Sequence, residues 1–250
     1  MKRKIRVAAV NYLNTKPLIY GFEQGLMQDE IELVTDYPAS IAEMLINGEV
    51  DLALVPVATI PLLKTYNIIS SYCIGCNGEV ASVCLFSDVP IDEIETILLD
   101  YQSKSSVGLL KILLKEFWKI NPTLEYAEKG YEENIKNKTA GLVIGDRAFA
   151  QRKKSKYIYD LGTAWFDFTG LPFMFAAWIS SMPLDENFIA RFNEANALGF
   201  NNLQTVIENN ICEDYDLHKY YTENISYQLD YEKKFAMELY LKKLKLDYRH

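Results

Sequence analysis

The sequence predicts an α/β fold divided into two lobes, and three observations support this prediction. The chain has 250 residues, close to the size at which one hydrophobic core becomes two. From residue 5 to about residue 87, short apolar runs alternate with segments of helical periodicity, a pattern typical of βαβ units around a mainly parallel sheet. A second stretch of this kind begins after Pro90. We therefore expect two lobes with a cleft between them.

Apolar runs and turn residues predict the elements of both lobes. The expected strands of the first lobe cover residues 5–10, 31–36 and 50–55, with a helix at 40–47 that Gly48 ends. Two further strand-like runs, 68–76 and 80–86, flank Asn77-Gly78, which is a strong turn signal. In the second lobe we expect strands at 96–99, 124–127 and 141–144, and a helix at 105–118.

The apolar run 172–178 predicts a strand that returns the chain to the first lobe. Amphipathic helices are expected after it, at 185–209, 216–223 and 230–244. In the last of these, Phe235, Leu239 and Leu244 are expected to contact the core. Lobe 1 should therefore contain residues 1–89 and 177–250, and lobe 2 residues 90–176.

Composition excludes several classes of partner. The net charge of −8 argues against nucleic acid, since the basic cluster at 152–156 is isolated. No apolar run approaches the roughly 20 residues that span a bilayer, so no membrane partner is expected. The basic start resembles a signal peptide, but Arg6 and Asn11 break the apolar segment that follows, which favours a cytoplasmic protein. The oligomeric state stays open.

No metal or cofactor is expected. Cys73 and Cys76 have the spacing of half a zinc or redox site, but no second pair exists and the two histidines, His218 and His250, are far away in sequence. Buried structural cysteines are the favoured interpretation, and a metal or a disulfide is the alternative. The glycine motifs that bind nucleotide phosphates are absent from the sequence.

The loop after the first predicted strand is the first candidate for a site. Asn11 and Asn14 lie between the strand and a helix that Thr15 can cap and Pro17 can begin. Residues 57–59 open a second loop at the same edge, because parallel strands direct their carboxyl ends to one side. The two loops can share a ligand. The alternative is that Asn14 only turns the chain.

Hydroxyl groups provide the second candidate. Ser103, Ser105 and Ser106 stand at the start of a predicted helix, where unpaired N–H groups and the helix dipole favour an anion. Capping alone needs one hydroxyl, so three suggest a carboxylate or a phosphate. Ser82 lies within an apolar run and needs a hydrogen-bond partner, which is either a ligand or the neighbouring backbone.

Asp146 follows the predicted strand 141–144 at the cleft side of the sheet. Its carboxylate can act as a base, bind a substrate hydroxyl or cap the following turn. Further on, Trp165 and Phe168 either form a wall of the cleft or pack around the hinge.

Five separated motifs together resemble the chorismate dehydratase family, the first enzymes of the futalosine route to menaquinone. They extend over nearly the whole chain and read Asn-Tyr-Leu-Asn-Thr-Lys-Pro-Leu at 11–18, Gly-Glu-Val-Ala-Ser-Val at 78–83, Gln-Ser-Lys-Ser-Ser at 102–106, Ile-Gly-Asp at 144–146 and Thr-Gly-Leu-Pro-Phe at 169–173. The resemblance implies a two-lobed, periplasmic-binding-protein-like fold of type II. It also implies a cytoplasmic lyase that converts chorismate to 3-[(1-carboxyvinyl)oxy]benzoate without a cofactor.

The resemblance also implies roles for individual residues. Asn14 carries over as the catalytic amide, and Asp146 is either the general base or secondary to the carboxylate of the substrate itself. The substrate-facing positions are implied to be Asn11, Ser82, Ser103, Ser105, Ser106 and Thr169.

Two alternatives remain open. A related family of the same pathway makes the cyclic futalosine derivative and has a catalytic histidine near the position of Gly145 and Asp146. The absence of histidine there favours the dehydratase. The second alternative is a non-catalytic protein of the same fold that binds a small carboxylate.

Overall fold

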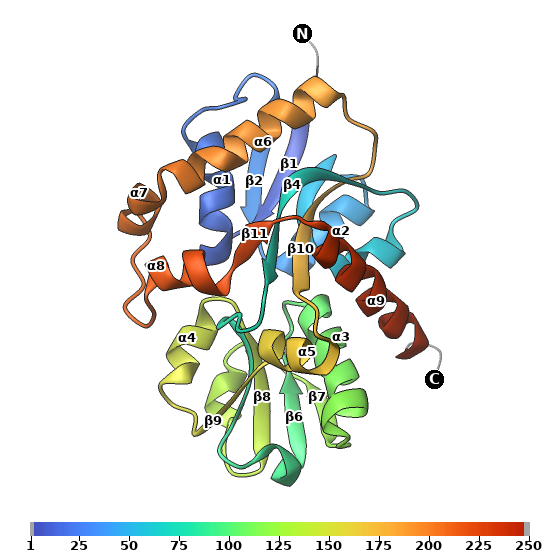
Figure 1. Cartoon of the computed structure of the whole chain (residues 1–250), viewed down its shortest axis with the longest axis vertical. Helices are drawn as coiled ribbons and strands as arrows, with labels where there is room; N and C mark the ends of the chain where they lie inside the picture. The colour runs from blue at the N-terminus through green and yellow to red at the C-terminus, as the bar shows by residue number, and fades with distance from the viewer. Residues whose placement is uncertain (1–2, 248–250) are drawn as a thin grey trace.

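The computed structural model describes residues 3–247 and contains two β-sheets, one above the other (Figure 1). The six-stranded sheet has the order β11-β4-β10-β3-β1-β2 and forms the upper lobe, which holds the beginning and much of the end of the chain. The five-stranded sheet of the lower lobe has the order β7-β6-β8-β5-β9. None of the helices in the described part of the chain combines the length and apolar character needed to cross a bilayer.

Apolar strands form the centre of the upper lobe. β1 and β3 carry buried apolar side chains along most of their length and pair in parallel, as the sequence predicts. The strands of this sheet are β1 (Ile5–Val10), β2 (Ile31–Asp36), β3 (Leu52–Pro56), β4 (Asn67–Cys76), β10 (Phe173–Ser180) and β11 (Ser226–Gln228). The helices beside them are α1 (Lys16–Glu23), α2 (Pro38–Ile46), α6 (Glu186–Asn201), α7 (Leu203–Glu208), α8 (Leu217–Lys219) and α9 (Tyr231–Asp247). Short 3-10 or π turns cover Leu13–Thr15, Val57–Leu62 and Tyr220–Asn224.

The lower lobe contains the strands expected at 96–99, 124–127 and 141–144 and the helix expected at 105–118, with small shifts at their ends, and further elements that were not predicted for it. Its strands are β5 (Val83–Ser87), β6 (Thr96–Leu99), β7 (Thr123–Tyr126), β8 (Thr139–Ile144) and β9 (Tyr157–Asp160). Its helices are α3 (Lys104–Ile112), which continues as a π turn over Leu113–Trp118, α4 (Arg147–Arg152) and α5 (Leu161–Thr169). The predicted helix at 105–118 is therefore one α-helical segment with a π-helical end.

In each sheet, the first strand that comes from the other lobe is antiparallel to its neighbours. β5 pairs antiparallel with β8 and β9, and β10 pairs antiparallel with β3 and β4. The parallel strands β1, β3, β6 and β8 end at the junction between the lobes. A chain that crosses this junction reaches the next sheet at its carboxyl edge, so it has to run in the opposite direction.

The expected boundary of the first lobe at residue 89 is wrong. The strand-like runs 68–76 and 80–86 belong to different sheets, because β4 lies in the upper sheet and β5 in the lower one. The chain therefore changes sheets between residues 77 and 82, and not after the expected boundary at residue 89. The turn signal was real, since Gly78 has a φ of 111°, but the turn connects two lobes. The chain returns to the upper sheet between α5 and β10, close to the expected position.

Asp160 holds the first crossover against the start of α5. Its Oδ1 accepts hydrogen bonds from the backbone N–H groups of Val80, Gly162 and Thr163 at 3.1, 2.9 and 3.1 Å. Its Oδ2 accepts from the N–H of Ala81 at 2.8 Å. Ala81 has a left-handed φ of 64°, which is strained for a residue with a Cβ. The carboxylate fixes this conformation and, with it, the position of the next residue.

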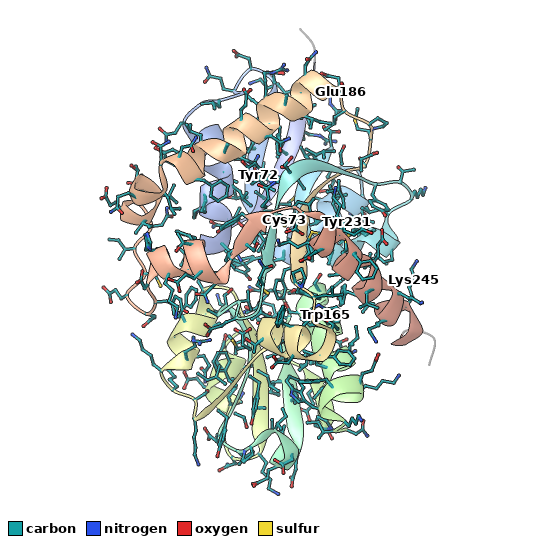
Figure 2. All side chains as sticks on the ribbon, in the orientation of Figure 1. Tyr72, Cys73, Trp165, Glu186, Tyr231 and Lys245 are labelled. Carbon is teal, nitrogen blue, oxygen red and sulfur yellow. The ribbon has the colours of Figure 1, made fainter. Side chains whose placement is uncertain are left out.

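The C-terminal helix α9 descends from the upper lobe to α3 of the lower lobe (Figure 1). Trp165 lies on α5 near this junction (Figure 2). It is fully buried, and its indole Nε1 donates to the carbonyl of Pro172 at 3.0 Å. It packs the hinge, one of the two expected alternatives. On α9 Leu244 is buried as predicted, but Phe235 is 50% exposed and does not belong to the core.

Replacement of Asp160 by asparagine tests the role of this carboxylate in stability. The Nδ2 group of asparagine would replace either Oδ1 or Oδ2. Because Nδ2 is itself a donor, at least one backbone N–H group would then face a donor in place of an acceptor. We expect Asp160→Asn to lower the free energy of unfolding by about 2–4 kcal/mol, as measured by urea denaturation.

Asp216→Asn is the matched control. Asp216 caps α8 through Oδ1, which accepts from the N–H groups of His218 and Lys219. Asparagine caps helices about as well as aspartate, so the control should be nearly neutral. Equal effects of the two substitutions would contradict the proposed role of Asp160.

Candidate active site

A pocket lies between the two lobes, at the carboxyl ends of their parallel strands. Its empty volume is about 500 Å³, part of which is open to solvent. Both sheets and the first crossover contribute to its lining, which consists of Val10, Tyr12, Asn14, Pro38, Pro56, Ile74, Val80, Ser82, Val83, Ser103, Ser106, Ile144, Gly145, Phe175 and Ala176. Of the predicted site residues, Asn14, Ser82, Ser103 and Ser106 are therefore brought together here.

Asn14 reaches the pocket from the short 3-10 turn that follows β1. The hydroxyl of Tyr227 on β11 donates to the backbone carbonyl of Asn14 at 2.8 Å. The hydroxyl of Thr15 donates to Asn14 Oδ1 at 3.3 Å. Thr15 occupies the N-cap position of α1 but makes no capping hydrogen bond with its side chain, so this part of the prediction is wrong. Its hydroxyl instead helps to orient the amide.

Ser82 follows the strained residue Ala81 and precedes β5. Its Oγ accepts a hydrogen bond from the hydroxyl of Tyr220 at 2.6 Å, and its backbone carbonyl accepts from the N–H of Gly145 at 2.8 Å. The bond to the side chain of Tyr220 is a partner that neither sequence-based alternative named.

The serines at the start of α3 divide into two groups. Ser103 is the N-cap residue, since its Oγ accepts from the N–H of Ser106 at 3.2 Å, and the hydroxyl oxygens of these two residues are 3.0 Å apart. Both line the pocket. Ser105 is not among the lining residues, because its Oγ accepts from the N–H of Ala58 in the upper lobe at 3.0 Å. Two hydroxyls, and not three, are thus directed to the pocket.

Asp146 connects the lobes and is not among the lining residues. It stands at the start of α4 without a side-chain capping bond. Its Oδ1 and Oδ2 instead lie 3.1 and 3.4 Å from the backbone N–H of Leu13, which donates to them. Burial raises the pKa of Asp146 from 3.8 to about 6, although the Leu13 N–H and the charges of Lys16 and Arg147 oppose the rise. The interpretation of Asp146 as a cap of the following turn is therefore wrong.

Asn11 and Thr169 are also not among the residues that line the pocket. Asn11 is exposed, and its Oδ1 accepts from Lys16 Nζ at 3.1 Å. The Thr169 hydroxyl donates to the carbonyl of Trp165 at 2.7 Å and accepts from the N–H of Leu171 at 3.2 Å. Their predicted contact with a ligand has no support in this geometry.

Tyr12 lines the pocket and is bonded to Gln102, and neither was predicted as a site residue. The hydroxyl of Tyr12 in the upper lobe donates to Oε1 of Gln102 in the lower lobe. Arg147 donates to the same oxygen at 2.9 Å and forms an ion pair of 2.5 Å with the buried carboxylate of Asp100. Gly145 leaves room for the ring of Tyr12, since an added Cβ would lie 3.0 Å from this ring and the φ of Gly145 is 64°.

The cysteines have a structural environment. Cys73 and Cys76 are buried free thiols on β4. Cys73 is labelled in Figure 2, and burial raises its pKa to about 12. Within residues 3–247 no group of three His, Cys, Asp or Glu side chains could hold a metal ion.

Comparison with known proteins identifies the family. A profile of a family described as menaquinone biosynthesis matches residues 5–245. The chain belongs to this family. A chorismate dehydratase from Thermus thermophilus is 29% identical to it over 219 residues, which are 79% of this chain and 78% of that protein. The resemblance to chorismate dehydratase that the five motifs carry is thus confirmed.

Solved structures confirm the fold of this menaquinone-biosynthesis family member. Protein AF1704 from Archaeoglobus fulgidus superposes with a TM-score of 0.75 and 17% identity, over 99% of this chain and 98% of that one. A Candida albicans protein, CA3427, described as having the generic periplasmic binding protein fold, gives a TM-score of 0.62 at 15% identity, over 98% and 90% of the two chains. The predicted two-lobed, periplasmic-binding-protein-like fold of type II is therefore correct.

Asp146 should make stability depend on pH. Since its pKa is raised to about 6 on folding, the folded state holds an extra proton between about pH 4 and pH 6. The free energy of unfolding therefore falls as the pH rises through this window. Asp146→Asn cannot ionise, so its stability relative to the unsubstituted protein should increase from about pH 4 to 6 and stay constant above that.

Urea unfolding at a series of pH values measures this difference. Asp216→Asn, at an exposed helix start, controls for the introduction of an amide. A stability difference for Asp146→Asn that does not change with pH would contradict the raised pKa.

Proposed function

We propose that this chain dehydrates chorismate to 3-[(1-carboxyvinyl)oxy]benzoate, the reaction of the chorismate dehydratase family. The observation that carries this proposal is a pocket between the lobes that combines apolar walls with neutral hydrogen-bonding groups from Asn14, Ser82, Ser103 and Ser106. Such a site can hold a ring and orient its polar substituents without a cofactor. The named relative from Thermus thermophilus supports the same reaction.

The start of α3 is the proposed site for one carboxylate of the substrate. The pocket side chains that the structure describes carry no charge near neutral pH, so an anion has to be bound by dipoles. Ser103 and Ser106 supply two hydroxyls, and the first turn of α3 supplies backbone N–H groups with the positive end of the helix dipole. Local donors of this kind let a chain with a net charge of −8 bind an anion.

The proposed base is the enolpyruvyl carboxylate of the substrate. Neither a carboxylate nor an imidazole is found among the pocket side chains of the described chain, and Asp146 is bonded to the N–H of Leu13. The substrate carboxylate is tethered near C3 and can take its proton. The electrons of the C–H bond then form a ring double bond, the C4 hydroxyl leaves as water with the proton that the carboxylate has taken, and the ring becomes aromatic. Tethering makes this proton transfer effectively unimolecular.

The same pocket argues against the sister family. That family resembles this chain but has a histidine near Gly145, where the pocket has only the glycine backbone and the ring of Tyr12. His218 lies on α8 and is exposed. Among the described residues, histidine is therefore not positioned for the sister reaction.

The decisive experiment is incubation of the purified protein with chorismate. We expect loss of chorismate and formation of an aromatic enolpyruvyl benzoate, detected by its ultraviolet spectrum and by proton NMR. Chorismate that persists unchanged would contradict the proposal. Conversion of the sister family's futalosine-derived substrate to its cyclic product would favour the alternative.

Asn14 is proposed to stabilise developing charge on the substrate. An amide cannot abstract a proton, but it can donate a preorganised hydrogen bond. Asn14→Ala should therefore lower kcat about 10²–10³-fold while chorismate still binds, as measured by steady-state kinetics and calorimetry. A kcat for Asn14→Ala equal to that of the unsubstituted protein would refute the role of Asn14.

Ser106→Ala should instead raise KM more than it lowers kcat, because the carboxylate contact is made in the ground state and transition state alike.

Asp146→Asn separates the two candidate bases. The substitution is nearly isosteric, and Oδ1 of asparagine can still accept from the N–H of Leu13. If the substrate carboxylate is the base, kcat should stay within about tenfold of the original value, since a neutral acceptor is retained. Loss of nearly all turnover with intact chorismate binding would identify Asp146 as the base instead.

A further inference from the structure

Tyr220 is a buried tyrosine behind the pocket that the family motifs do not include. It lies in the π turn Tyr220–Asn224 after α8, and its side chain is fully buried. Its ring packs edge-on against Phe149, with 4.9 Å between the ring centroids, and near Tyr215 at 6.1 Å. The ring is thus held on two sides, and its hydroxyl reaches Ser82 from outside the pocket.

The direction of the Tyr220–Ser82 hydrogen bond determines whether Ser82 can donate to a ligand. The phenol donates to Ser82 Oγ at 2.6 Å, the direction favoured by the greater acidity of a phenol over an alkyl hydroxyl. The serine oxygen then has to direct its own proton elsewhere. Its protein acceptor in the structure is the carbonyl of Val80 at 3.5 Å, a long and weak contact. The proton of Ser82 is therefore available to an acceptor in the pocket.

The Tyr220 hydroxyl keeps its proton near neutral pH. Burial raises the pKa of Tyr220 well above its ordinary value, although the hydrogen bond with Ser82 opposes the rise. The phenol therefore remains a donor to Ser82, which lies in the crossover to the lower lobe. The neighbouring segment holds the same region, since Tyr227 donates to the carbonyl of Asn14.

We propose that Tyr220 is a positioning residue that makes Ser82 a hydrogen-bond donor to an oxygen atom of the substrate. The substrate oxygen that accepts from Ser82 belongs either to a carboxylate, which only accepts hydrogen bonds, or to a hydroxyl, which also donates them. The proposal rests on the proposed function, because it assigns a substrate contact within that pocket. It adds a residue that does not itself line the pocket.

A double-mutant cycle on Tyr220 and Ser82 tests the proposal. Tyr220→Phe keeps the ring and removes the hydroxyl, and Ser82→Ala removes the hydroxyl that Tyr220 is proposed to orient. Each single substitution should lower kcat/KM for chorismate by about tenfold. The double variant should be no slower than Ser82→Ala, because Tyr220 acts through Ser82. Losses that multiply, or a Tyr220→Phe variant with unchanged kinetics, would overturn the proposal.

Tyr215→Phe is the matched control. Tyr215 belongs to the same aromatic group and stacks on Phe149, but its hydroxyl donates to Asn224 at 3.0 Å and not to Ser82. Removing this hydroxyl should leave kcat/KM unchanged. A loss for Tyr215→Phe equal to that for Tyr220→Phe would mean that general packing accounts for both, and the positioning role would be refuted.

A measurement without turnover separates this inference from the proposed function. The Cβ–Hβ signals of Ser82 in protein labelled with ¹³C-serine report on its hydroxyl and are assigned by their absence in Ser82→Ala. Tyr220→Phe should shift these signals, and Tyr215→Phe should not. If the unsubstituted protein fails to dehydrate chorismate, the proposed function fails, and this spectrum still decides whether Tyr220 orients the pocket groups. Unshifted signals would overturn the positioning role whatever the enzyme assay gives.

Discussion

The carboxylate of Asp160 is the interaction on which the cleft depends. It accepts from backbone groups of the first crossover and from the start of α5, the helix that leads to the second crossover. Packing leaves no room for adjustment, because a Cβ on Gly162 would lie 2.3 Å from the carbonyl of Gly78. The two connections between the lobes are thus joined to each other, and Ser82 occupies a fixed position between them.

Much of the fold was accessible from sequence because β-strand and helix periodicity are local properties. The ranges 5–10, 31–36 and 96–99 coincide with observed strands. The first crossover was not accessible, because Asn77-Gly78 makes the same local turn whether the next strand pairs with the last one or enters another sheet. The partner of β5 is determined by pairing with β8 and β9, which local patterns do not encode.

The candidate site was predictable to the extent that loop position determines it. Asn14, Ser103 and Ser106 line the pocket because they follow the ends of strands at the junction. Ser105 differs, because the geometry of a helix turns its side chain toward Ala58. Tyr220 is separated from Ser82 by more than half of the chain, and a motif read along the sequence has no means of connecting them. Side-chain partners of this kind appear only in three dimensions.

The division of strands between the sheets has a consequence for the order in which the protein folds. The five-stranded sheet draws on residues 83–160 alone, whereas the six-stranded sheet needs residues 5–56, 67–76, 173–180 and 226–228. During synthesis the lower lobe can therefore complete its sheet while the upper lobe still lacks β10 between β3 and β4. Until about residue 180 has emerged from the ribosome, the apolar edges of β3 and β4 remain unpaired, and the nascent chain is most exposed to aggregation in this interval.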